Sequence, residues 1–270
     1  MFRRLLMMVF CGVAVASCFD PPEYPNTPEI VFRSLNFVPV PGDDTPDSLI
    51  LVLRFKDGDG NMGLAPTEIQ PPFNDRWYYV KANLDEKLTP GCTPYKQSNK
   101  CYYYNLNQKT EFDKYVDIED RDSGKKPYDT LKPFDKPYNC VNWEVVRDNT
   151  GTIVDKIYFT LNPHYSNIFV EFQTKTGTNQ NDPEYPYVPF SWSDFLTYPS
   201  CEVQGFNGRF PLLMEQGANE SPLEGEIRYA MPSQFFKIIF GAKTLRLKVH
   251  IEDRALNQSN IVYSNDFNFN

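Results

Sequence analysis

Histidine is scarce in this chain of 270 residues, which contains only His164 and His250. The GxSxG elbow of serine hydrolases, the HExxH sequence of zinc proteases and the Walker phosphate loop are all absent from the sequence. No CxxC pair occurs either, which argues against a structural zinc site and against thioredoxin-type redox chemistry. With these catalytic motifs missing, we expect a protein that is not an enzyme.

Basic residues are outnumbered, with 27 Lys and Arg against 35 Asp and Glu, and the net charge is −8. Because nucleic-acid phosphates require a basic surface, this balance argues against nucleic acid as a partner. Long apolar runs are also missing after the N-terminus, where no segment approaches the roughly 18 apolar residues that a membrane-spanning helix needs. We therefore expect the N-terminal region to supply any attachment to a membrane.

Residues 1–17 have the features of a lipoprotein signal peptide. Two arginines precede an apolar run over residues 5–15, which is too short to span a bilayer and is typical of a signal-peptide core. The sequence Val-Ala-Ser-Cys at residues 15–18 resembles the bacterial lipobox, whose cysteine is acylated and becomes the new N-terminus. This resemblance implies that lipid on Cys18, such as palmitate, anchors the protein to a membrane.

Residues 18–28 have the composition of a tether. They contain four prolines and show no apolar periodicity, which predicts an extended and semi-rigid segment. Asp20 and Glu23 resemble the acidic signals that send lipoproteins of Bacteroidota to the cell surface, although a solvated acidic linker has the same composition. We expect an outer-membrane protein that faces the cell surface, with the periplasmic face as the alternative.

Four cysteines remain after the signal peptide and the lipidated Cys18: Cys92, Cys101, Cys140 and Cys201. In an exported chain four cysteines allow three disulfide pairings. We expect Cys92–Cys101 to close a short loop and Cys140–Cys201 to pin a long insertion.

Alternation of apolar and polar residues predicts strands near both ends of the chain. Residues 49–55 and 245–251 each place their apolar side chains on one face, and residues 30–37 change phase in a way that predicts a bulge. Between about residues 66 and 222 the pattern loosens, and polar, proline-rich segments separate short strand-like runs. We therefore predict an all-β fold over residues 29–270, an Ig-like antiparallel sandwich with a large, loop-rich, disulfide-pinned insertion at about 66–222.

Two motifs carry a family resemblance. FKDGDGNMGL at residues 55–64 and IEDRALNQSNIV at residues 251–262 look like uncharacterised surface lipoproteins of Bacteroidota with Ig-like or cadherin-like sandwiches. The resemblance includes the lipobox but not the middle of the chain. It implies a fold and a location, and no particular activity.

The first of these motifs has the spacing of a calcium loop. Asp57, Asp59, Asn61 and Glu68 fall at its first, third, fifth and twelfth positions, and calcium takes six to eight oxygen ligands. Met62 stands where the EF-hand glycine belongs, and no flanking helices are predicted. The alternative is a solvated turn whose aspartates bond their own backbone.

A second loop should lie beside this one. In an Ig-like sandwich the loops after the second and sixth strands emerge at the same end, so Asp253 would approach the first motif. Calcium is then a candidate ligand of both loops. Arg254 offers the alternative, in which a guanidinium neutralises the acidic side chains without a metal.

These observations favour an accessory or structural subunit that binds other envelope proteins in an outer-membrane complex. A surface glycan-binding module is the first alternative, with the aromatic runs at residues 77–79 and 102–104 as candidate stacking surfaces. A hydrolase that uses two of the many carboxylates is the second alternative.

Overall fold

The computed structural model describes residues 23–39, 47–79, 115–176, 186–195, 198–199, 201, 205–214, 221–233 and 235–269. The predicted signal peptide, the lipidation site Cys18 and the predicted pair Cys92–Cys101 lie outside the described residues. Within the described ranges no helix has the length and apolar character needed to cross a membrane.

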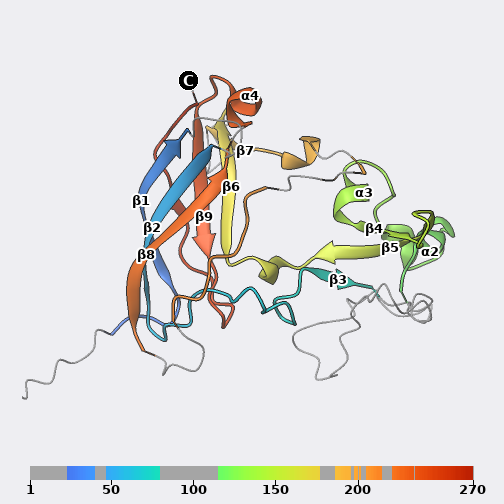
Figure 1. Cartoon of the computed structure of the whole chain (residues 1–270), viewed down its shortest axis with the longest axis horizontal. Coiled ribbons are helices and arrows are strands. Elements are labelled where there is room, and N and C mark those ends of the chain that lie inside the picture. Colours follow the sequence, from blue (N-terminus) through green and yellow to red (C-terminus); the bar gives the residue numbers. More distant parts are fainter. Residues whose placement is uncertain are drawn as a thin grey trace, which may run out of the picture.

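Two antiparallel sheets face each other around the main core (Figure 1). The first sheet has the order β1–β2–β8 and contains β1 (Glu29–Val38), β2 (Ser48–Asp57) and β8 (Leu223–Pro232). The second has the order β10–β9–β6–β7 and contains β10 (Val262–Tyr263), β9 (Leu245–Ile251), β6 (Ile168–Lys175) and β7 (Tyr187–Pro189). The predicted all-β sandwich is therefore confirmed.

The strand order matches that of an immunoglobulin domain. If β1, β2 and β8 are strands A, B and E, and β6, β9 and β10 are strands C, F and G, the two sheets read A-B-E and G-F-C. In this topology β2 and β9 run in the same direction, so the segments that follow them leave the sandwich at the same end.

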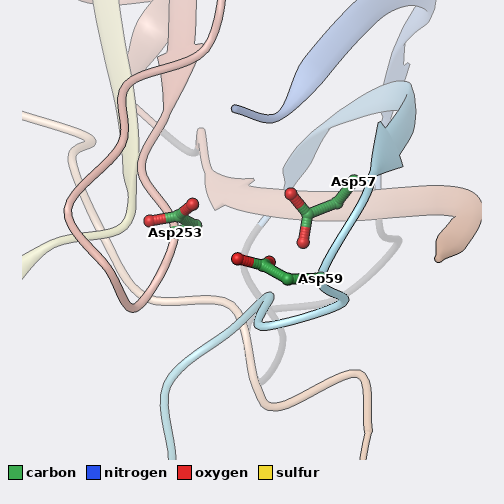
Figure 2. A group of neighbouring side chains, drawn as sticks. All are labelled: Asp57, Asp59 and Asp253. Carbon is green, nitrogen blue, oxygen red and sulfur yellow. The ribbon is translucent and has the colours of Figure 1, made fainter. Parts of the chain in front are cut away.

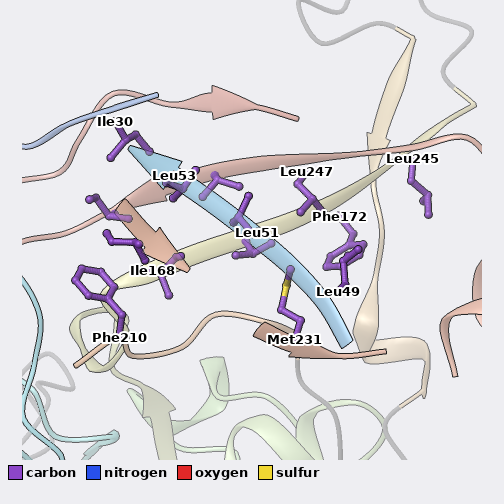
Figure 3. Close-up of a cluster of buried hydrophobic side chains, with 14 of the residues drawn as sticks. Ile30, Leu49, Leu51, Leu53, Ile168, Phe172, Phe210, Met231, Leu245 and Leu247 are labelled. Carbon is purple, nitrogen blue, oxygen red and sulfur yellow. The ribbon is translucent and has the colours of Figure 1, made fainter. Parts of the chain in front are cut away.

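Alternation in β2 and β9 builds the core. Leu49, Leu51 and Leu53 point inward from β2 and meet Leu245 and Leu247 of the opposite sheet (Figure 3). The predicted bulge in β1 is present, because the register of β1 against β2 shifts between Phe32 and Ser34. At the end of the sandwich from which β9 starts, α4 (Phe236–Phe240) packs its aromatic rings onto the core.

The chain between β2 and β6 forms a second, smaller unit beside the sandwich, called the inserted unit below (Figure 1). Its sheet has the order β3–β5–β4, with β3 (Arg76–Tyr78), β5 (Ile153–Leu161) and β4 (Trp143–Arg147). Its short helices are α2 (Ile118–Asp122), η2 (Tyr128–Thr130) and α3 (Tyr138–Val141), and η3 (Pro163–Tyr165) leads on to β6. Two small clusters of buried aromatic and aliphatic side chains hold the inserted unit together.

The insertion is shorter than the sequence pattern predicts. The predicted range 66–222 includes β6 and β7, which belong to the sandwich because β6 pairs with β9 from Ile168↔Ile251 to Thr174↔Leu245. A second excursion, between β7 and β8, contains η4 (Trp192–Phe195). The expected insertion is thus divided in two by strands of the second sheet.

A disulfide joins these two excursions. Cys140 in α3 bonds to Cys201 in the connection between β7 and β8, and their Cα atoms are 5.3 Å apart. This confirms the predicted pair Cys140–Cys201 and its role in pinning the insertion.

Candidate metal centre

Asp57 and Asp253 each continue the inward face of a core strand. In β2 every second residue from Leu49 to Phe55 is buried, and Asp57 is next in that phase, with 0% of its surface exposed. In β9 the same alternation ends at Ile251, and Asp253 follows two residues later with 2% exposed. Because the two strands run in the same direction, both carboxylates reach the same end of the sandwich.

Asp59 joins them from the turn that follows β2 (Figure 2). One carboxylate oxygen from each of Asp57, Asp59 and Asp253 lies within 4.8 Å of the other two. Calcium–oxygen bonds of about 2.3–2.6 Å place opposite ligands of one ion roughly 4.6–5.2 Å apart. The three carboxylates, called the acidic cluster below, are thus spaced as ligands of a single ion.

Glycine allows the turn to pack closely against two other segments. A Cβ atom on Gly58 would lie 2.3 Å from the backbone oxygen of Tyr24, and its N–H donates to the oxygen of Pro25 at 2.8 Å. Gly60 has a φ of +68°, and a Cβ atom there would lie 2.4 Å from the backbone oxygen of Ser221. The turn is therefore wedged between the end of the N-terminal tether and the start of β8.

Buried polar atoms at this site have no hydrogen-bond partner among the described residues. Neither carboxylate oxygen of Asp57 accepts a hydrogen bond, and neither does Oδ1 of Asn61, although all three atoms are buried. Such atoms are rare in folded proteins, since a buried acceptor without a partner carries the full cost of its desolvation. Among the described residues, these three oxygens are therefore available as ligands of a cation.

Electrostatics point the same way. Burial, reinforced by the neighbouring charge of Asp59 and then of Asp253, raises the pKa of Asp57 to about 7. Burial also raises the pKa of Asp253, against the hydrogen bonds from Asn257 that favour its charged form. A cation placed among the three carboxylates would remove this penalty by favouring their ionised forms.

Asn257 orients the carboxylate of Asp253. The backbone N–H of Asn257 donates to Oδ1 of Asp253 at 2.8 Å, and its side-chain amide donates to Oδ2 at 2.8 Å. Carboxylate ligands of metals are commonly held by such outer hydrogen bonds, which leave lone pairs free for the ion.

Glu68, the fourth residue of the predicted calcium loop, has a different partner. Its Oε1 lies 2.5 Å from an Arg254 nitrogen, and its Oε2 accepts from the backbone N–H of Ala65 at 2.6 Å. Arg209 fixes the same turn by donating to the backbone oxygens of Ala65 and Glu68. Glu68 therefore lies outside the acidic cluster. Its place at the twelfth position of the calcium-loop pattern wrongly predicted it as a ligand.

The same ion pair decides the alternative role of Arg254. Its side chain binds Glu68, and its backbone N–H donates to the oxygen of Asn61 at 3.2 Å. In the described part of the chain no Lys or Arg forms an ion pair with Asp57, Asp59 or Asp253. Arg254 thus supports the loop without neutralising the aspartates.

A cavity of about 390 Å³ lies beside the disulfide in the inserted unit, with Arg76, Trp143 and Glu144 among its lining residues. Its walls come from separate parts of the chain, so no local sequence pattern predicts it. Glu144 accepts a hydrogen bond from Arg76 at 2.9 Å and another from the hydroxyl of Tyr78. This carboxylate is therefore engaged in a structural network.

The aromatic run at residues 77–79 packs largely within the inserted unit. Tyr78 lies edge-on to Tyr115 with ring centroids 5.8 Å apart, and Tyr79 lies edge-on to Tyr158 at 5.4 Å. These contacts are those of a core, as expected for alternating aromatic residues on a strand. The second aromatic run, at residues 102–104, lies outside the described residues.

Comparison with known proteins gives no match for this chain among family models, curated proteins or solved structures. The assignment of the acidic cluster as a candidate metal centre therefore rests on the geometry, burial and electrostatics of its own residues.

Proposed function

We propose that this protein is a non-catalytic, lipid-anchored lipoprotein of a bacterial outer membrane, which binds other envelope proteins as an accessory or structural subunit. The observation that carries this proposal is the fastening of the inserted unit to the sandwich. The disulfide Cys140–Cys201 joins its helix α3 to the connection between β7 and β8, and the Glu68–Arg254 pair joins its starting segment to the hairpin after β9.

Rigid fastening of this kind suits a surface that contacts another protein. When the binding surface is already rigid, fewer of its side chains and loops have to be ordered on binding. The entropic cost of association is then smaller, and the affinity is higher. An inserted unit that only filled space would need no such attachment at two places.

The tip of the inserted unit offers a contact surface. β5 runs toward the sandwich, so its first residues lie at the far end of the inserted unit (Figure 1). There Ile153 and Val154 are 43% and 54% exposed, next to the turn that joins β4 to β5. Adjacent exposed aliphatic side chains at a projecting tip are available to a protein partner.

The tether meets the sandwich at the end that carries the acidic cluster. The hydroxyl of Tyr24 donates to Glu224 at 3.1 Å, and the Lys56 ammonium lies 4.9 Å from the centre of the Tyr24 ring. Tyr24 is six positions after Cys18, and six extended steps of the chain span at most about 22 Å. With lipid on Cys18, the root of the inserted unit would be held close to the membrane surface, where an envelope partner is embedded.

Affinity purification of the tagged full-length protein from native membranes, after mild crosslinking, tests this function. The double variant Ile153→Asp, Val154→Asp should lose the partner proteins that the wild type enriches. Ile238→Asp is the matched control, because Ile238 is 81% exposed on α4, in the sandwich. Equal recovery of partners by both variants would contradict the role of the tip, and recovery of no envelope protein by the wild type would contradict the function.

Mass spectrometry of the same preparation tests the anchor. The wild-type N-terminal peptide should begin at an acylated Cys18, and Cys18→Ala should leave the chain without acyl groups. An unmodified Cys18 in membrane-purified wild-type protein would overturn the lipid anchor.

The cavity beside the disulfide favours glycan binding as the second candidate function. Its volume of about 390 Å³ is within the range of small-ligand pockets, and its lining combines Arg76 with aromatic side chains. Titration of the protein with a panel of soluble oligosaccharides should then show saturable binding, and an absence of binding across the panel would dismiss this candidate.

A further inference from the structure

We propose that one calcium ion binds between Asp57, Asp59, Asn61 and Asp253 and locks together the loops at the membrane-facing end of the sandwich. The ion site is argued from the described residues alone, whereas its orientation toward the membrane rests on the function proposed above.

The number of oxygen atoms at the site suits calcium. Asp57 offers two carboxylate oxygens without hydrogen-bond partners, and Asp59 and Asp253 offer at least one each, which makes four. Asn61, whose backbone N–H donates to Oδ1 of Asp59 at 3.3 Å, lies in the same turn and would add its buried amide oxygen as a fifth. Calcium takes six to eight oxygen ligands, and water or backbone carbonyl groups usually complete the set.

Burial separates this cluster from an ordinary acidic surface. Exposed carboxylates are solvated and tolerate one another, but Asp57 has no exposed surface, and its carboxylate is directed toward Asp59 and Asp253 (Figure 2). Asn61 contributes a second and different observation, since its buried amide oxygen also has no partner. A distant Arg or Lys could balance the charge of the carboxylates, but it would leave the neutral amide oxygen of Asn61 without a partner. Calcium would bind that oxygen directly, because amide oxygens are common calcium ligands.

The chemistry of the donors selects calcium among the common metals. The cluster contains oxygen donors and neither His nor Cys, which disfavours zinc and copper. Magnesium demands near-ideal octahedral geometry and retains several waters, whereas two of the three converging carboxylates here, those of Asp57 and Asp253, are buried. The irregular turn at residues 57–61 can supply the flexible, higher coordination that calcium accepts.

Calcium at this position would join segments that are far apart in the sequence. Asp57 and Asp59 belong to the turn that starts the inserted unit, and Asp253 belongs to the hairpin after β9. The same turn already bonds to the tether through Gly58 and Pro25 and to the segment before β8 through Met62 and Leu213. Without the ion, three carboxylates repel one another at the centre of this junction, so calcium should reduce its motion.

Calorimetric titration of the chelator-treated full-length protein with calcium chloride tests the site. We expect one calcium ion per chain and a higher melting temperature in calcium than in chelator. Asp59→Asn should weaken calcium binding by at least about tenfold. Asp194→Asn is the matched control, because it makes the same chemical change at an exposed residue of η4 and should leave calcium binding unchanged.

Asp57→Asn gives a second, independent readout. If Asp57 is a ligand held against like charges, this variant should melt at a higher temperature than the wild type in chelator and should gain nothing from calcium. A lower melting temperature in chelator together with a retained calcium response would show an ordinary structural aspartate and overturn the proposal.

Hydrogen exchange of the wild type tests the predicted effect on the junction. Amide protons at residues 58–64 and 254–259 should exchange more slowly in calcium, while those of the inserted unit at residues 143–147 should not respond. No calcium heat and no change in melting temperature would overturn the site, and a response to magnesium alone would overturn the choice of ion. If the protein recovers its partners but does not bind calcium, only this inference is overturned. If it binds calcium but recovers no envelope partner, only the proposed function is overturned.

Discussion

Arg254 and Glu68 form an ion pair with N–O atoms 2.5 Å apart, and their side chains are 29% and 15% exposed. From the sequence, Glu68 is predicted as a calcium ligand and Arg254 as a cation that neutralises the aspartates, but the two side chains bind each other instead. This pairing leaves Asp57, Asp59 and Asp253 without a basic partner in the described part of the protein. The carboxylates of the acidic cluster are therefore available to a metal ion because Arg254 is paired with Glu68 beside the cluster.

The first prediction separates Glu68 from the calcium ligands. Glu68→Gln should lower the free energy of unfolding by about 1–3 kcal/mol, because Arg254 then loses its charged partner in a partly buried position. Calcium affinity should remain within about threefold of wild type, since Glu68 touches Arg254 and not the cluster. Urea unfolding in chelator and calcium titration measure the two effects. A loss of calcium binding as large as that of Asp59→Asn would restore Glu68 as a ligand.

The second prediction concerns the disulfide. Replacing Cys140 and Cys201 with serine should lower the free energy of unfolding by roughly 2–4 kcal/mol, because the bond restricts the unfolded chain. Denaturant unfolding of oxidised wild type and of the double variant measures this difference. Thiol labelling of the denatured, non-reduced wild type, followed by peptide mapping, should leave both cysteines unlabelled. Labelling of Cys201 would mean that the two excursions are not covalently joined.

The third prediction concerns the main core. Leu51 has no exposed surface and lies in the middle of the inward face of β2. Leu51→Ala should cost about 2–5 kcal/mol of stability through lost burial and the cavity left behind. Ile238→Ala, at a residue that is 81% exposed, should change stability by no more than about 0.5 kcal/mol. Similar losses in both variants would contradict the placement of β2 at the centre of its sheet.

The fourth prediction concerns pH. His250 stacks on Phe169 with ring centroids 4.5 Å apart, and burial, together with the charge of Lys248, lowers its pKa below 6.5. The unfolded chain therefore binds a proton at His250 before the folded chain does, so the contribution of His250 to stability is lost as the pH falls through about 6.5 toward the lower folded pKa. His250→Gln carries no titrating group there, so it should lose less stability over that range.

Unfolding free energies of wild type and His250→Gln at about pH 7.5 and pH 5 measure this effect as a difference. Other groups that titrate in this range, including Asp57, are present in both proteins and largely cancel. A wild type that gains stability relative to the variant on acidification would reverse the assigned shift.

Several local features could be predicted from the sequence because their causes are local. Alternation alone places residues 49–55 and 245–251 on inward faces, since successive side chains of a strand point to opposite sides. The phase change in β1 likewise follows from the order of apolar residues, and the register shift between Phe32 and Ser34 confirms it. The same alternation, continued by two residues, carries Asp57 and Asp253 inward.

The tertiary structure alone decided which distant segments meet. The run at residues 168–173 is strand-like in sequence, but only its pairing with β9, more than 70 residues later, shows that it belongs to the sandwich and not to the inserted unit. Spacing along the chain suggested Glu68 as a ligand, whereas folding brings Arg254 to it from the other end of the protein. The partner of each such residue depends on the free energy of the whole fold, because many other residues could occupy the same position beside it. Local sequence cannot choose among them. Local pattern therefore determined the strands and the inward aspartates, and long-range packing determined the boundary of the insertion and which oxygens remain for a metal ion.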